Sequence, residues 1–182
     1  MKQTNIKNLI LSALCLALGL VLPSAFHAIG AGTVFLPMHI PVLLCGLICG
    51  WQYGAVCGFI VPLLSSLITS MPPIFPVAPA MMLELCAYGL LTGLFYRYYK
   101  WNLYLAMGGA MLAGRAVSGC ANAIFMGMAG KPYGVSAFLT GAFVTALPGI
   151  ILQLIVVPLL VVALQKSGLV QNPRLDGEKC HA

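Results

Sequence analysis

Charged side chains are too scarce in this chain to cover a surface that faces water. Of its 182 residues, nine are Lys or Arg and three are Asp or Glu, which gives a formal net charge of +6. Charged residues make up 7% of the chain and hydrophobic residues 61%, against roughly 25% and about 45–50% in soluble domains. The composition excludes a soluble globular fold and indicates that the chain folds in a bilayer.

Six apolar runs predict an all-α, polytopic membrane protein with a bundle of six transmembrane helices. Since one crossing takes about 20 apolar residues, 182 residues suffice for six helices in one membrane domain, residues 1–182. The first run resembles a signal peptide, but no A-x-A cleavage site follows it, so we expect it to be retained. The expected helices cover about residues 6–22, 37–49, 51–70, 80–96, 103–128 and 135–164, and a polar tail covers 165–182.

Basic residues orient this bundle. Six helices put both termini on one side, and the positive-inside rule assigns the more basic side to the cytoplasm. With the termini inside, the outer side carries only Lys131, and the inner side carries Lys2, Lys7, Arg97, Lys100, Lys166, Arg174 and Lys179. We therefore expect cytoplasmic termini in the cell's plasma membrane, and we expect no nucleic-acid partner. Segments 23–36, 71–79 and 129–135 then face outward, and the four prolines of 71–79 predict a stiff, partly extended connection.

Two charged residues fall inside expected helices. Glu84 lies about four residues from the outer end of its helix, and Arg115 lies near the middle of the next one. Both should face the bundle interior, because an unpaired charge in lipid is costly. Their depths differ by about 10 Å at the helical rise, so a direct pair and a pair bridged by water or ligand both fit. A solute site, a structural ion pair and a proton relay remain open as roles.

Further polar and aromatic residues lie at helical spacing around this pair. Together they predict a polar spot in an apolar cup that opens outward, the usual form of a small-molecule site. His39 and Phe35 suit internal packing as well as ligand contact. The candidate substrate-binding residues are Phe35, His39, Met81, Glu84, Tyr88, Arg115, Ser118 and Asn122.

Several catalytic and metal-binding signatures are missing from the sequence. It contains no Walker A motif, no H-E-x-x-H and no G-x-S-x-G, so we expect neither ATP binding by that motif nor an enzyme. The seven cysteines form no C-x-x-C pair and are interpreted as small apolar residues. No cofactor, metal site or catalytic residue is predicted.

Small residues recur at the spacing that lets membrane helices approach closely. Ala13 and Ala17 form A-x-x-x-A in the first run, and Gly89 and Gly93 form G-x-x-x-G in the fourth. Each stripe fits internal packing or the docking of a partner helix.

Two segments resemble a known family. LPMHIPVLLCGLICG (residues 36–50) and SSLITSMPPIFPVAPAMMLELCAYGLLTGLFYR (residues 65–97) look like the substrate-binding S component of energy-coupling factor (ECF) vitamin transporters. The likeness covers about residues 6–165 and points to the subgroup that includes pantothenate S components.

The resemblance implies an ABC importer subunit that binds a water-soluble vitamin near the outer face. Such a subunit docks through its first helix, here Ala13 and Ala17, onto a transmembrane coupling subunit that carries two cytoplasmic ATPases. Pantothenate, folate, a pyridoxine-type compound and cobalamin stay open as substrates. The alternative is a stand-alone proton-coupled carrier that uses Glu84.

Overall fold

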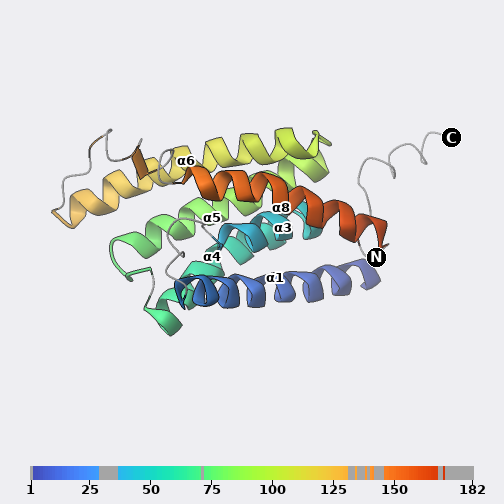
Figure 1. Ribbon diagram of the computed structural model, residues 1–182, viewed down its shortest axis with the longest axis horizontal. Helices are drawn as coiled ribbons and strands as arrows, with labels where there is room; N and C mark the ends of the chain where they lie inside the picture. Colours follow the sequence, from blue (N-terminus) through green and yellow to red (C-terminus); the bar gives the residue numbers. More distant parts are fainter. Residues whose placement is uncertain are drawn as a thin grey trace.

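A computed structural model describes residues 2–28, 37–70, 72–130, 134, 138, 140, 141, 146–167 and 170 of the chain. Every regular element in these ranges is helical, so the all-α class is confirmed for the described part (Figure 1). The elements are α1 (Lys2–Ala28), α3 (His39–Cys49), α4 (Trp51–Thr69), α5 (Val77–Gly93), the π-helical turn η1 (Leu94–Tyr98), α6 (Leu103–Met128) and α8 (Leu147–Lys166).

Four of these helical stretches are long and apolar enough to cross a bilayer. They are Ile6–Phe26, Trp51–Thr69, Val77–Tyr98 and Leu147–Lys166. α3, with 11 residues, is too short for a hydrocarbon core about 30 Å thick. α6 has the length, but its glycines and Arg115 lower its mean hydropathy. The chain is therefore a membrane protein with four candidate spans among the described residues.

Two helices begin or end inside segments that we expected to be irregular. α1 continues through Pro23 to Ala28, because a single proline can kink a membrane helix without ending it. α5 begins at Val77, within the expected extended segment 71–79. Pro79 fits its first turn, where the backbone N–H groups have no partner within the helix.

The last expected helix also differs from the structure. A continuous helix was expected over residues 135–164, but Ala146 forms a turn and α8 begins at Leu147. Pro148 lies in the first turn of α8, a position that suits the fixed φ of proline. Most of residues 135–145 lie outside the described residues.

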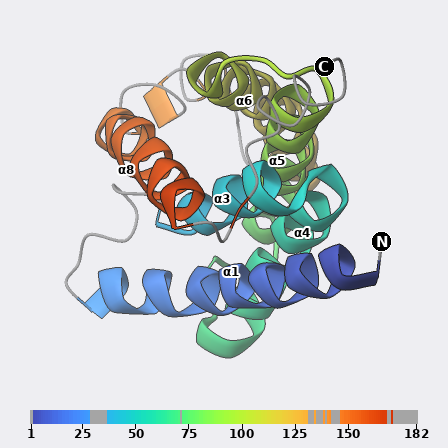
Figure 2. The same cartoon turned by 90° about the vertical axis from the view of Figure 1, so that its right-hand side faces the viewer.

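The short helix α3 is the centre of the bundle. All of its 11 residues are buried. It packs against α1, α4, α5 and α8, and Figure 2 shows it enclosed by these helices. The core therefore forms around α3, and Val42, Leu43 and Cys45 have no exposed surface.

Glycine brings α4 and α5 into backbone contact. A Cβ added at Gly89 of α5 would collide with the backbone of Gly54 in α4, and one at Gly93 would collide with the backbone of Trp51. Gly58 likewise faces the Leu85 carbonyl. The Gly89/Gly93 stripe therefore serves internal packing, one of the two roles that its spacing allowed.

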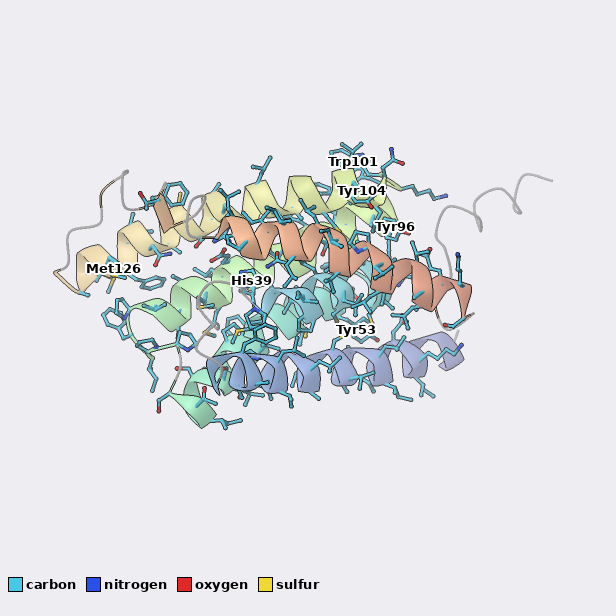
Figure 3. All side chains as sticks on the ribbon, in the orientation of Figure 1. His39, Tyr53, Tyr96, Trp101, Tyr104 and Met126 are labelled. Carbon is cyan, nitrogen blue, oxygen red and sulfur yellow. The ribbon has the colours of Figure 1, made fainter. Side chains whose placement is uncertain are left out.

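One end of the bundle gathers aromatic and basic residues. Figure 3 shows Tyr96, Trp101 and Tyr104 at this end and Met126 at the other. The first turn of α1 and the last turn of α8 lie at the same end as Trp101 (Figure 1). Arg97 lies here as well and donates a hydrogen bond of 2.6 Å to the carbonyl of Ile48.

Candidate functional site

Glu84 is the centre of a buried polar cluster between α5, α6 and α3. Its carboxylate is 3.1 Å from Arg115 Nη1 and accepts hydrogen bonds from Ser118 Oγ at 2.7 Å and from the Tyr88 hydroxyl at 3.2 Å. His39 Nε2 lies 3.7 Å from the same carboxylate. The direct pair of Glu84 and Arg115, one of the two arrangements that their depths allowed, is present.

Helical spacing and one glycine position these groups. Glu84 and Tyr88 are one turn apart on α5, and Arg115 and Ser118 are neighbours on one face of α6. The Tyr88 ring packs against Gly114 of α6, where an added Cβ would lie 2.5 Å from the ring. Gly114 therefore admits the ring that donates to Glu84.

Asn122 extends the cluster along α6. Its Nδ2 donates to the Ser118 carbonyl at 2.9 Å and approaches Ser118 Oγ at 3.2 Å. Ser118 in turn donates to Glu84. The three side chains form one hydrogen-bonded chain from the carboxylate toward the end of α6 that lies opposite Trp101 (Figure 3).

His39 is buried but has no hydrogen-bond partner in the described structure. It is the first residue of α3 and is 1% exposed. Both of its ring nitrogens lack a hydrogen bond, and the ring meets Tyr88 edge-on with centroids 5.2 Å apart. Figure 3 shows His39 in the interior of the bundle. Its Nδ1 has no hydrogen bond in the described structure and its Nε2 has only the 3.7 Å approach to Glu84, so the imidazole can hydrogen-bond a further group.

The charges in the cluster balance, yet donors remain. Glu84 and Arg115 contribute one negative and one positive charge, and the Arg115 side chain is 13% exposed. A guanidinium carries five N–H donors, and the contact with Glu84 uses one of its nitrogens. The cluster can therefore donate hydrogen bonds to an incoming group without exposing an unpaired charge.

The remaining candidates differ in what the structure describes. Met81 is half-buried one turn before Glu84 and packs against the apolar core. Phe35 lies outside the described residues. In the described ranges, no group of three or more His, Cys, Asp or Glu side chains is arranged to hold a metal ion.

Sequence reasoning missed Gln153 of α8. The residue is 1% exposed, and its Nε2 has no hydrogen-bond partner in the described structure. A signal was available, because Gln153 is the only polar residue between Pro148 and Gln165. A polar residue in the middle of an apolar membrane helix tends to face the bundle interior.

The docking candidates of α1 are exposed. Ala13 and Ala17 both lie on its surface, whereas Cys15 and Gly19 of the same helix are buried. Ala13 borders a groove of about 500 Å³ between α1 and α4, lined by Leu9, Ser12, Ala13, Leu16, Gln52, Tyr53, Val56 and Cys57.

These features define an integral membrane protein with a buried polar cluster among its helices. The chain belongs to the family of ECF transporter substrate-specific components, whose family model matches residues 7–161. No curated protein and no solved structure is significantly similar to it. It is thus a substrate-specific membrane subunit of an ECF transporter, a transport component rather than an enzyme, and its family works with an ECF module in a lipid bilayer.

Proposed function

We propose that this chain binds a water-soluble vitamin in the polar cluster around Glu84 and releases it inward when docked on an ATP-driven module. The observation that carries the proposal is the buried pair of Glu84 and Arg115, beside which neither ring nitrogen of His39 makes a hydrogen bond in the described structure. Phe35, Met81, Tyr88, Ser118 and Asn122 complete the proposed site. Family membership supplies the transport role.

The proposed topology places the vitamin site toward the outer face. The whole chain, residues 1–182, forms one domain in the plasma membrane with six spans and cytoplasmic termini. The shared end of α1, α8 and Trp101 in Figures 1 and 3 supports this orientation, as does the excess of basic residues on that side.

Ala13 and Ala17 form the proposed docking face. Both are exposed on α1, and small side chains let a partner helix approach closely in lipid. The partner is the transmembrane coupling subunit of the ECF module, which carries two cytoplasmic ATPases. Copurification of both ATPases with the tagged chain tests this assembly, and their absence would contradict it.

The proposed substrate is a pantothenate-type vitamin. Arg115 offers charged donors, and His39 and Asn122 offer further hydrogen-bonding groups, which suits a small molecule with a carboxylate, amide or hydroxyl group. A proton-coupled carrier is less well supported, because Glu84 is enclosed by Arg115, Tyr88 and Ser118. Folate, pyridoxine-type compounds and cobalamin are the other outcomes of the substrate test.

The test combines a vitamin panel with a double-mutant cycle. Radiolabelled pantothenate, folate, pyridoxine and cobalamin are each offered to the purified protein and to Glu84→Gln, Arg115→Gln and the double variant. Each single change should destabilise the protein by about 3–5 kcal/mol, because it leaves a buried charge unpaired. The double variant should regain much of that stability.

Affinity separates a ligand site from a structural ion pair. We expect the double variant to fold, as its melting temperature reports, and to bind the vitamin about 10- to 100-fold more weakly, since hydrogen bonds to charged groups are worth about 1.5–3 kcal/mol. A double variant that keeps full affinity would contradict the assignment of Glu84 and Arg115 to the binding site.

A further inference from the structure

Three buried side-chain atoms in the described structure lack a hydrogen-bond partner. They are Nδ1 and Nε2 of His39 and Nε2 of Gln153. Buried polar groups in folded proteins are nearly always paired, so each exception needs an explanation. His39 belongs to the site already described, and Gln153 is not explained by it.

The position of Gln153 on α8 makes the missing hydrogen bond of its Nε2 costly. It lies one turn from Gly149 and from Val157, and both of these residues are buried. Val161, one turn further, is buried as well. This stripe is the inward face of α8, and Gln153 is its one amide. A carboxamide on such a face is destabilising unless something supplies its partner.

α8 packs against two of the helices that carry the polar cluster. It packs against α3, which begins with His39, and against α6, which carries Arg115 and Ser118. α3 and α8 lie side by side in Figures 1 and 2. Both helices begin toward the end of the bundle opposite Trp101, and His39 is labelled in the interior there (Figure 3). Gln153 comes in the second turn of α8, in the half of the helix that lies toward this end.

We infer that Gln153 is a further substrate-binding residue, whose Nε2–H donates a hydrogen bond to an uncharged oxygen of the substrate, an amide carbonyl or a hydroxyl. The inference rests on the proposed function and assigns this chemistry to the α8 side of the same site. The oxygen is uncharged because the stripe around Gln153 is apolar, and a buried charge without an ionic partner is costly. A carboxylate of the substrate belongs on the Arg115 side.

The test uses Gln153→Met, which keeps the length of the side chain and removes its polar atoms. The probe is whichever radiolabelled vitamin of the panel, pantothenate first, binds the unmodified protein. The variant should bind this vitamin about tenfold more weakly, equivalent to about 1.4 kcal/mol. Its melting temperature without vitamin should stay the same or rise, because an unpaired buried donor has been removed.

Gln165→Met is the matched control on the same helix. Gln165 Nε2 already donates to the Tyr96 hydroxyl at 3.0 Å, three turns away toward the opposite end of the bundle. This variant should lower the melting temperature and leave the vitamin affinity unchanged. The two glutamines are thus expected to respond in opposite ways to the same chemical change.

The remaining outcomes separate two failures. Full affinity in Gln153→Met, together with lost binding in Arg115→Gln, overturns the role of Gln153 and leaves the proposed function standing. A large fall in the melting temperature of Gln153→Met without vitamin shows a structural role and also overturns the inference. An unmodified protein that binds none of the four vitamins overturns the proposed function and this inference with it.

Discussion

Two stripes of small residues with the same spacing have opposite surroundings in this molecule. Gly89 and Gly93 on α5 are buried against the backbone of α4, so closely that neither position has room for a Cβ. Ala13 and Ala17 on α1 are exposed, and Ala13 borders a groove. One stripe is closed by a helix of the same chain, and the other is open.

The difference shows what a small-x-x-x-small motif means. Its spacing indicates that a helix can be approached closely along one face. Whether the approaching helix belongs to the same chain depends on which helices the fold brings together. In this bundle α4 covers the glycine stripe, and in the described part of the chain α1 packs chiefly against α3 and α4. The open stripe is the one with room for a partner.

The largest expected effect comes from filling the closed stripe. Gly89→Val should destabilise the protein by more than about 3 kcal/mol, because the added carbons meet the Gly54 backbone, which cannot rotate away. Melting temperature in detergent and the yield of monodisperse protein measure this effect. Gly108→Ala is the control, since nothing lies within 4 Å of a Cβ at Gly108. A stable Gly89→Val protein would show that α4 and α5 are not in backbone contact.

A smaller effect is expected where a glycine admits a side chain. Gly114→Ala places its methyl group against the Tyr88 ring, which is 1% exposed and enclosed on all sides. We expect a loss of about 1–2 kcal/mol in stability. Vitamin binding should weaken as well, because the displaced ring no longer donates to Glu84. Unchanged vitamin affinity would show that Tyr88 does not contribute to the binding site.

The smallest effect on stability is expected at the open stripe. Ala13→Trp and Ala17→Trp should change the free energy of unfolding by no more than about 0.5 kcal/mol, since both positions are exposed. Vitamin binding should persist in both variants. Uptake by cells and copurification of the ATPases should be lost, because an indole ring holds the partner helix away.

The control for this pair is Leu112→Trp on α6. Leu112 is 65% exposed, so the variant adds the same indole to a surface that no docking role has been proposed for. It should retain uptake. Normal uptake in the doubly substituted Ala13→Trp/Ala17→Trp protein, at normal expression, would show that the docking face lies elsewhere.

Charge alone was enough to predict the inward positions of two residues, and whether they bind a substrate stays a prediction. Glu84 and Arg115 had to turn inward, because lipid tolerates neither, and they meet at 3.1 Å. Tyr88, Ser118 and Asn122 follow from helical spacing, and all join the hydrogen bonds around Glu84. His39 kept two possible roles at the sequence level, and only its packing beside Tyr88 and Glu84 brought it to the cluster.

Neutral residues and chain breaks were harder to predict. Gln153 carries no charge, so its isolation in an apolar run is a weaker signal than that of Glu84 or Arg115, and its burial on α8 revealed its inward position. The proline-rich segment reads as a helix breaker, yet α5 begins at Val77 and includes Pro79. Proline destabilises a helix less in its first turn, where the backbone N–H groups have no partner within the helix. Whether a given proline falls in that turn depends on where the helix starts.

The sequence by itself determined that the chain folds in a bilayer, that it is helical and that two charged residues must face inward. These follow from free energies of transfer, which depend on residue type and hardly on neighbours: twelve charges cannot cover a protein in water, and a lone charge cannot face lipid. Only the tertiary structure decided that α3 is the centre, that α4 closes the glycine stripe and that the alanine stripe stays open. Those outcomes depend on contacts between segments far apart in the chain, where van der Waals fit selects one pairing of helices among several that the same spacing permits.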